Sequence, residues 1–522
     1  MPGLDPTIIG LIDTNLSLGR IRRDLNSDFI LSPHYAAVFA HASDDLWEQT
    51  KSSLRSGCFE PELPITIEVP KLTGLTRPGS ILKPMDRLVY QTLIDVIAPT
   101  AERYIDRSRT FSHVLVDPDP EYQMFKNDHD CWNNLQESIK QYSEDPNWSH
   151  AIRADVANFF ERLYQHVLIN LLRSSDCPSG AVNLLEELLL SWMERDSHGI
   201  LQGMFPSDFL GNFYLVGLDS YLEVQGVPSA RFVDDLYIFY PSKPGAQKGM
   251  TELCKSLRRE GLHLNDRKSQ ILETEKLIHE ETQIDRMFNE AREELVGVFP
   301  GANWYGFQSI WLSEESERSE EEVTLHAVES LYQRIEEPDA PSNRIELFCL
   351  PILAEAGSEI AVQRALEGLV ERPYLAKIYS SYLMRLIRVN PQIKNEMQRV
   401  LKEGDFSYDW QLMWPIAALL STDRIEHSTV TTVIRILCNH SCSVALRALS
   451  AIFVGKHGDP GQRRNLIQQY SNEPSDYVRE AILFASRYFP ASERRSCMSA
   501  WGGHSKVNAL IARAVQKIIQ NA

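Results

Sequence analysis

Long apolar runs are missing from this sequence of 522 residues, and that absence excludes one class of protein. No uninterrupted apolar stretch approaches the roughly 18–20 residues that a membrane-spanning helix requires. Residues 1–15 contain no basic segment ahead of an apolar core, so we expect no secretory signal there. Eight cysteines are scattered along the chain, as in cytoplasmic proteins with reduced thiols. We therefore expect a cytoplasmic protein without a membrane partner.

Positive charge is also scarce. The chain has 53 Lys and Arg residues against 71 Asp and Glu residues, which gives a net charge of −18. A protein that grips a long duplex neutralises many phosphates and is usually basic. The acidic balance therefore argues against a processive copier of long templates. The length favours two or three domains, and 43% hydrophobic residues indicate a globular protein.

Two adjacent aspartates lie inside an apolar and aromatic stretch, residues 231–240, which reads R-F-V-D-D-L-Y-I-F-Y. The flanking residues have high strand propensity, so we expect a buried hairpin with Asp234 and Asp235 at its tip. Buried carboxylates are costly unless they are paired or bind a metal ion. The alternative is an ordinary turn, because Asp-Asp is also common in hairpin turns.

Three further segments accompany this pair in order. Residues 151–163, A-I-R-A-D-V-A-N-F-F-E-R-L, place Asp155 on a short apolar strand that leads into a helix. Residues 199–207 read G-I-L-Q-G-M-F-P-S, and residues 261–271 read G-L-H-L-N-D-R-K-S-Q-I. The order and spacing of the four segments resemble motifs A, B, C and D of a reverse transcriptase palm. The resemblance covers about residues 60–275, and the joint pattern is more specific than any single motif.

This resemblance implies an α+β fold: right-hand polymerase fingers and palm with an antiparallel sheet. We expect an N-terminal helical segment of the fingers over residues 1–60. Fingers and palm follow over residues 61–310, with a thumb-like end. An acidic run, S-E-E-S-E-R-S-E-E-E, marks a linker over residues 311–325. Residues 326–522 have a helical pattern throughout.

Nucleotide addition is an in-line displacement at the α-phosphate, and two metal ions about 3.5–4 Å apart can promote it. Mg²⁺ prefers oxygen ligands in near-octahedral geometry. By resemblance, Asp155, Asp234 and Asp235 are the acids that hold two Mg²⁺ ions, or Mn²⁺ in their place. Lys268 matches the lysine of motif D, which could protonate the leaving pyrophosphate as a general acid. The alternative for Lys268 is an ordinary surface lysine.

The resemblance also names residues that contact the incoming nucleotide. Phe160 lies where the family has its steric gate, a ring that collides with a ribose 2′-hydroxyl, which implies dNTP substrates. The competing interpretation places Phe159 and Phe160 in the core, although adjacent residues do not face the same way. Gln202 and Gly203 resemble the motif that lies along the nucleotide. The candidates for holding the triphosphate are Arg77, Lys83 and Arg87, and the alternative for them is a solvated surface hairpin.

Residues 444–449, 478–483 and 507–512 share a helical pattern that recurs at spacings of 34 and 29 residues. Such periods are typical of stacked helix pairs in an α-solenoid, similar to HEAT repeats. The alternative is a non-repeating helical bundle.

A reverse transcriptase palm followed by helical repeats, without a clear RNase H or maturase domain, resembles the bacterial abortive-infection (Abi) reverse transcriptases that confer phage resistance. This resemblance implies untemplated DNA synthesis in a bacterial cytoplasm, priming from a protein tyrosine, single-stranded DNA that stays covalently attached, and a homo-oligomer. We expect Tyr35, in a loop-like stretch, to be the primer. The alternatives are a templated enzyme that uses a noncoding RNA, like retron or group II intron enzymes, and a catalytically idle helical-repeat scaffold.

Overall fold

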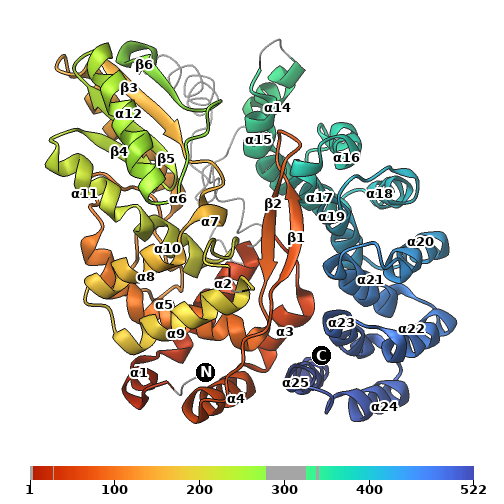
Figure 1. The fold of residues 1–522 in the computed structure, drawn as a ribbon. Coiled ribbons are helices and arrows are strands. Elements are labelled where there is room, and N and C mark those ends of the chain that lie inside the picture. The colour runs from red at the N-terminus through yellow and green to blue at the C-terminus, as the bar shows by residue number, and fades with distance from the viewer. Residues whose placement is uncertain (1–3, 28, 195, 278–324, 337–339, 522) are drawn as a thin grey trace.

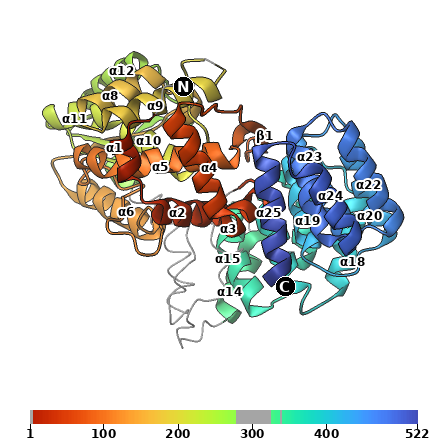
Figure 2. The same ribbon diagram turned by 90° about the horizontal axis from the view of Figure 1, so that it is seen from below.

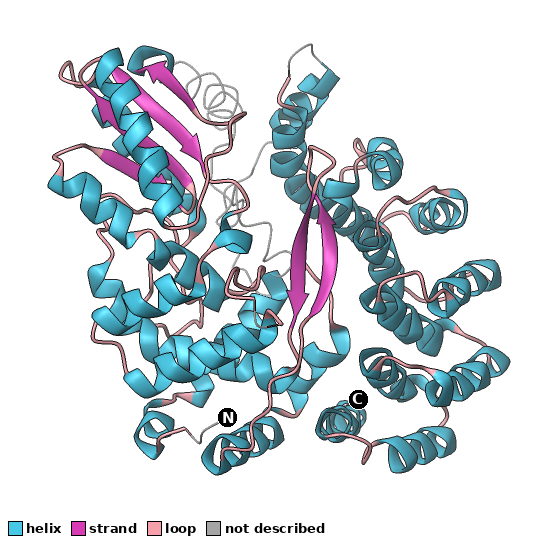
Figure 3. Ribbon diagram, viewed as in Figure 1, coloured by secondary structure: helices cyan, strands magenta, loops and turns pink. Residues whose placement is uncertain are grey.

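The computed structural model describes residues 4–27, 29–194, 196–277, 325–336 and 340–521. Strands are few, and they form two separate antiparallel sheets in a mostly helical molecule (Figure 3). The predicted thumb-like end and the predicted linker fall almost entirely on residues outside these ranges. Within the described ranges, no helix combines the length and the apolar character needed to cross a membrane.

The larger sheet has four antiparallel strands in the order β4-β5-β3-β6 (Figure 1). Its strands are β3 (His150–Asp155), β4 (Ser229–Phe232), β5 (Asp235–Tyr240) and β6 (Gln270–Glu273). Alternate side chains of β5 point to opposite faces, so Tyr237 and Phe239 pack towards α6 (Asp128–Glu144). Leu236 and Ile238 pack on the face covered by α12 (Lys243–Arg259). Burial of each large apolar side chain contributes about 1.5–3 kcal/mol, which explains why this strand reads as a continuous apolar run.

The smaller sheet is a hairpin of β1 (Ile65–Pro70) and β2 (Thr76–Ile81), followed by α5 (Pro84–Ala101). Helix α5 is buried on nearly all sides, as expected for a helix whose apolar residues do not form a single stripe. The other helices of this half are α1 (Pro6–Leu11), α2 (Thr14–Ser27), α3 (Pro33–His41), α4 (Ser43–Ser56), α7 (Phe159–Arg162), α8 (Gln165–Ser174), α9 (Ser179–Trp192), α10 (Phe205–Tyr214) and α11 (Val216–Val224).

From residue 325 onwards the described chain is helical, as predicted. The helices are α14 (Leu325–Gln333), α15 (Ser342–Ala356), α16 (Val362–Glu371), α17 (Ala376–Leu386), α18 (Gln392–Glu403), α19 (Asp409–Leu420), α20 (His427–Cys438), α21 (Val444–His457), α22 (Pro460–Asn472), α23 (Asp476–Ala485), α24 (Ala491–Trp501) and α25 (Lys506–Asn521). The odd-numbered helices from α15 to α25 form an inner row in which each contacts the next, and the even-numbered helices lie outside it (Figure 1). The three recurring sequence segments fall near the starts of α21, α23 and α25. Their assignment to the HEAT class stays a prediction.

The inner row packs against the first half of the chain. Helices α19 and α21 contact β1, while α23 and α25 contact α3, and Figure 2 shows α25 beside α3. The Tyr408 hydroxyl donates a hydrogen bond to the Gly74 carbonyl at the hairpin tip (3.2 Å), and the Trp410 indole N–H donates to the Phe29 carbonyl. An isolated two-stranded hairpin is only marginally stable in water. The helical half therefore supplies packing that β1 and β2 need.

Tyr35 lies within this interface. The prediction of a loop-like stretch is wrong, because Tyr35 is part of helix α3, which begins at Pro33. Its side chain is only 2% exposed, and its hydroxyl donates a hydrogen bond to Glu480 Oε2 in α23 (2.7 Å). Burial and the charge of Glu480 raise the pKa of Tyr35 well above its usual value. The ring also packs against Tyr477, with centroids 5.2 Å apart.

Glu480 is a buried titratable group of this interface, beside Tyr35, whose protonation depends on pH. Burial raises the pKa of Glu480 to about 7, although the Tyr35 hydrogen bond and the positive charge of Lys83 act in the opposite direction. The nearby charges of Asp476 and Glu62 raise it further. Because the pKa in the folded state is raised, the unfolded chain loses this proton first as the pH increases. This group therefore makes the protein less stable as the pH rises from about 4.5 to 7.

We expect Glu480→Gln to flatten this part of the pH dependence, since glutamine has no proton to lose and its carbonyl can still accept the Tyr35 hydrogen bond. In thermal unfolding between pH 5 and 8, the free energy of unfolding of Glu480→Gln should fall less than that of the wild type. The difference between the two proteins should be on the order of 3 kcal/mol at most. The exposed Glu371 gives a matched control, Glu371→Gln, which should follow the wild type. Identical pH profiles for Glu480→Gln and the wild type would refute this role.

Candidate active site

Strand pairing brings the three predicted acids to one end of the larger sheet. The register of β3 and β5 places Asp155 directly opposite Asp235. Phe232 pairs with Asp235 across β4 and β5, so Val233 and Asp234 form the two-residue turn between them. The Val156 N–H donates a hydrogen bond to the Asp234 carbonyl (3.3 Å). The expected hairpin with acids at its tip is therefore confirmed.

Two of the three acids, Asp234 and Asp235, lie in surroundings that disfavour their charged form. Burial raises the pKa of Asp234 to about 7, and the charges of Asp235 and Asp155 add to this effect. Burial and then the charge of Asp155 also raise the pKa of Asp235, against the opposing charges of Lys268 and Arg153. A carboxyl group with a raised pKa is held in an environment that disfavours its ionised form. A bound cation would reverse that preference.

The segment before β6 holds Asp155 in place. The Lys268 ammonium donates to Asp155 Oδ1 (2.7 Å), and the Asn265 side-chain amide donates to Asp155 Oδ2 (2.9 Å). The Asn265 N–H donates to the Asp155 carbonyl (2.8 Å), and the Asp155 N–H donates to Ser269 Oγ (3.3 Å). Sequence reasoning singled out Lys268 but assigned no role to Asn265 or Ser269. Both residues lie within three positions of Lys268 in the sequence, and this proximity could have indicated that they also contact Asp155.

Lys268 remains charged in this arrangement. Burial on its own would lower the pKa of Lys268, but the hydrogen bond and charge of Asp155, with the charges of Asp235 and Asp234, raise it overall. The side chain is still mostly exposed to solvent. The Lys268 ammonium is therefore protonated and in contact with solvent at the edge of the sheet.

The acids fit a divalent cation by their chemistry. All three offer carboxylate oxygens, the ligand type that Mg²⁺ prefers, and the Lys268 ammonium already stands at Asp155 Oδ1 as a positive charge. In this conformation, however, the described residues contain no group of three or more His, Cys, Asp or Glu side chains arranged to hold a metal ion. Both oxygens of Asp155 are engaged by Lys268 and Asn265. Each of these hydrogen bonds uses one lone pair of a carboxylate oxygen, so the other lone pairs of Asp155 remain for a metal ion.

Phe160 lies on α7, five residues after Asp155. Phe159 is buried in the core, whereas Phe160 is only half-buried. The two rings therefore differ in burial, although Phe160 also packs against the edge of the core. Phe160 packs on Gly211 of α10, where an added Cβ would lie 2.8 Å from Phe160 Cε1. Glycine at this position therefore lets the ring lie against the helix.

Backbone hydrogen bonds connect the segment around Gln202 and Gly203 to α7 and to the β1–β2 hairpin. The Ile200 N–H donates to the Phe160 carbonyl (2.9 Å), and the Ser80 N–H of β2 donates to the Gln202 carbonyl (3.4 Å). Gly203 has a φ of +89°, which L-residues with a side chain rarely adopt. The segment that carries Gln202 and Gly203 is therefore held to α7 through Ile200 and to β2 through Gln202.

Arg77 projects from β2 as an exposed residue. Its guanidinium carbon lies 4.5 Å from the centroid of the Phe29 ring, an arrangement typical of a cation–π contact. Of the three predicted triphosphate ligands, Arg77 has the most solvent-exposed position.

Lys83 and Arg87 are engaged elsewhere. Lys83 forms an ion pair with Glu62 and precedes α5 as its N-cap. Arg87 is buried and forms an ion pair with Asp24 of α2. Asp24 also accepts a hydrogen bond from the Phe205 N–H at the start of α10 (3.0 Å). Arg87 therefore ties α5 to the segment that carries Gln202.

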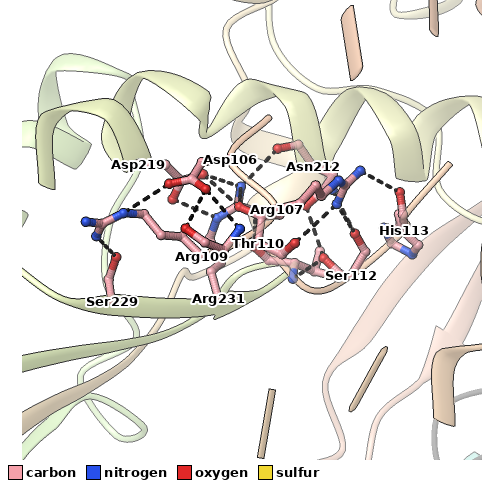
Figure 4. Close-up of polar contacts among 12 residues, drawn as sticks. Asp106, Arg107, Arg109, Thr110, Ser112, His113, Asn212, Asp219, Ser229 and Arg231 are labelled. Atoms are coloured by element: carbon pink, nitrogen blue, oxygen red, sulfur yellow. Dashed lines mark hydrogen bonds and ion pairs between the residues drawn. The ribbon is translucent and has the colours of Figure 1, made fainter. Parts of the chain in front are cut away.

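A buried polar cluster, shown in Figure 4, contacts the backbone of Val233, the residue before Asp234. Its centre is Arg231 of β4, whose guanidinium forms an ion pair with Asp219 of α11 (2.6 Å). Thr110, Ser112 and Asn212 complete the cluster. Its partners lie up to 121 residues from Arg231 along the chain, so no local pattern could indicate them.

Comparisons with known proteins agree with this geometry. Residues 69–287 match the family model for reverse transcriptase (RNA-dependent DNA polymerase). The chain is 26% identical over 209 residues to the COX1/OXI3 intron 2 protein of Saccharomyces cerevisiae, which covers 37% of this chain and 22% of that protein. The chain thus matches only about a fifth of its curated relative's length.

Solved structures give weaker similarities. Telomerase from Candida tropicalis with a TWJ fragment of telomeric RNA has a TM-score of 0.33 and 11% identity, covering 77% of this chain and 67% of that one. Apo telomerase from Candida tropicalis has a TM-score of 0.31 and 10% identity, covering 90% and 74%.

Proposed function

We propose that this chain, whose residues 69–287 form a reverse transcriptase domain, is a DNA polymerase that joins dNTPs with the help of two Mg²⁺ ions. The observation that carries the proposal is the convergence of Asp155, Asp234 and Asp235 on paired strands, with raised pKa values at two of the three. Asp155 and Asp234 would hold the ions, and Asp235 would support them from beside Asp155. When bound, such ions activate the attacking oxygen and stabilise the leaving pyrophosphate.

The remaining residues have separate roles in this proposal. Protonated Lys268 donates its proton to the departing pyrophosphate as a general acid. Phe160 lies under the sugar and excludes a 2′-hydroxyl, while Gln202 and Gly203 line the nucleotide. Exposed Arg77 binds the triphosphate directly. Lys83 and Arg87 could join it only after release from Glu62 and Asp24.

We further propose that synthesis is untemplated and protein-primed, as in the bacterial abortive-infection enzymes that confer phage resistance, and that the enzyme is a homo-oligomer. The net charge of −18 supports this proposal, because a long duplex would be poorly bound. A templated enzyme is the second candidate. It is favoured by the similarity to a protein encoded in an intron and by the match to an RNA-dependent polymerase family.

The two candidates differ in what purified, nuclease-treated protein does with each dNTP and Mg²⁺. Protein priming predicts DNA that stays attached after boiling in detergent, made without added nucleic acid, and lost in Tyr35→Phe. Since Tyr35 is enclosed beside Glu480, its hydroxyl must leave that interface to prime. The exposed tyrosines Tyr104 and Tyr122 provide matched controls, Tyr104→Phe and Tyr122→Phe. Product that forms only with an added RNA template and primer would establish the templated candidate.

Phe160→Ala should admit ribonucleotides, because removal of the ring vacates the space that a 2′-hydroxyl needs. We expect the ratio of rNTP to dNTP incorporation to rise at least about tenfold. Phe159→Ala is the matched control: its ring is buried, so truncation should lower the melting temperature without changing the ratio. An unchanged ratio in Phe160→Ala would place the gate elsewhere.

A further inference from the structure

The turn that carries Asp234 has a backbone conformation that its sequence disfavours. Val233 has a φ of +55°, in the left-handed region. A β-branched residue is rarely found there, because its side chain crowds the backbone. Two-residue hairpin turns favour glycine, asparagine or aspartate at such positions. Something other than local preference must therefore hold Val233 in place.

Two buried side chains hold it through its own backbone. The Val233 N–H donates a hydrogen bond to Ser112 Oγ (2.8 Å), and Arg231 Nη1 donates to the Val233 carbonyl (3.0 Å). Ser112 is 0% exposed and Arg231 is 1% exposed. In a buried site these bonds have no competition from solvent, so they fix the peptide groups on both sides of Val233.

Both partners are themselves immobilised (Figure 4). Arg231 donates to Asp219 Oδ1 and Oδ2 (3.1 and 2.6 Å) and to Asn212 Oδ1 (2.9 Å). Ser112 Oγ donates to the same Asn212 oxygen (3.0 Å). The Asn212 side-chain amide returns a hydrogen bond to the Ser112 carbonyl (2.9 Å). Helices α10 and α11 thus anchor the residues that hold the turn.

The cluster affects Asp234 through the backbone of the turn and not through the charge of Arg231. Asp219 pairs with Arg231 inside the cluster. The principal influences on the pKa of Asp234 are burial, Asp235 and Asp155. A group that sets the backbone of the preceding residue decides where the Asp234 carboxylate points.

We propose that Ser112 is a positioning residue of the polymerase centre: by accepting the Val233 N–H, it keeps the strained turn in the conformation that aims Asp234 at the metal ions. This inference rests on the proposed function and deepens it. Without the Ser112 hydroxyl, the Val233 N–H is left unpaired in a buried site and the strained conformation loses one of its two supports.

Glycine at position 233 provides a way to separate this role from general damage. Glycine adopts positive φ without steric cost, so a turn with Val233→Gly needs less external support. We expect Ser112→Ala to weaken metal binding about tenfold, the effect of one unpaired buried N–H. The double variant Ser112→Ala/Val233→Gly should return to within about twofold of Val233→Gly alone. Ser450→Ala, which truncates an equally buried serine in α21, should bind metal like the wild type.

The readouts are Mn²⁺ binding to the full-length protein, followed by electron paramagnetic resonance, and the Mg²⁺ concentration that gives half-maximal nucleotide addition. Weaker Mn²⁺ binding in Ser112→Ala, restored by Val233→Gly, would support the proposal. Wild-type Mn²⁺ affinity in Ser112→Ala, equal weakening in both Ser112 variants, or no Mn²⁺ binding by the wild type would overturn it. Intact Mn²⁺ binding without any nucleotide addition would refute the proposed function alone, and the Mn²⁺ series would still decide the role of Ser112.

Discussion

Asp234→Asn is expected to abolish nucleotide addition, by about 10³-fold or more, while leaving the protein at least as stable as the wild type. Asparagine keeps the shape of the side chain but removes the charge that attracts Mg²⁺. The pKa of Asp234 is raised to about 7 by burial and by its acidic neighbours, so at pH 8 its charge is unfavourable in the metal-free protein. Removal of that charge should therefore not lower the melting temperature.

The effect of Mg²⁺ on the melting temperature should also differ between the wild type and Asp234→Asn. A ligand that binds only the folded state raises its stability, so Mg²⁺ should raise the melting temperature of the wild type and not that of Asp234→Asn. The exposed Asp44 on α4 gives a matched control, Asp44→Asn, which should retain both activity and the Mg²⁺ response. Polymerisation by Asp234→Asn at close to the wild-type rate would refute the assignment of the acids.

Removal of residues 323–522 is expected to eliminate activity and to destabilise what remains. The inner row of helices covers β1 and α3. The hairpin of β1 and β2 does not pair with the larger sheet, so it depends on this cover. Truncation would expose Tyr35, which Glu480 and Tyr477 of α23 now cover, to water. Thermal unfolding and nucleotide addition by the truncated chain measure this directly, and a truncated chain that stays folded and fully active would show that the helical half is an independent accessory.

A single substitution tests the same dependence in the full-length chain. Trp410 of α19 is buried and donates its indole N–H to the carbonyl of Phe29, whose ring lies beside Arg77 of β2. Trp410→Ala should cost about 3–5 kcal/mol of stability and lower activity per folded molecule. Trp501→Ala is matched, because Trp501 is also buried but stacks on Tyr470 in the outer helices. Equal activity per folded molecule in the two variants would argue against a contribution of the interface to catalysis.

The acids and the hairpin could be predicted because their signals are local. Residues 231–240 combine strand propensity with two carboxylates, and a strand with buried side chains on both faces leaves little choice of structure. Asp155 likewise ends a mostly buried apolar strand, β3. The order of the segments then placed the acids on neighbouring strands, as the register confirms.

The partners of the basic residues could not be predicted, since they are distant in sequence. Arg87 pairs with Asp24, 63 residues away, and the hydrogen bond between Tyr35 and Glu480 spans 445 residues. Periodicity indicated helices over residues 444–512. It could not show that these helices pack on β1 and α3, because that contact joins distant parts of the chain. The same holds for Ser112, whose function lies in a hydrogen bond to a strained turn 121 residues later.

Incorporation of labelled dNTPs by the purified wild-type protein tests the central claim most directly. The reaction is run with Mg²⁺, both without nucleic acid and with an RNA template and DNA primer, beside Asp234→Asn. We predict that the wild type incorporates dNTPs under at least one condition and that Asp234→Asn incorporates none. Folded wild-type protein that incorporates no dNTP under either condition, with Mg²⁺ or with Mn²⁺, would contradict the assignment of a polymerase centre and favour a catalytically idle scaffold.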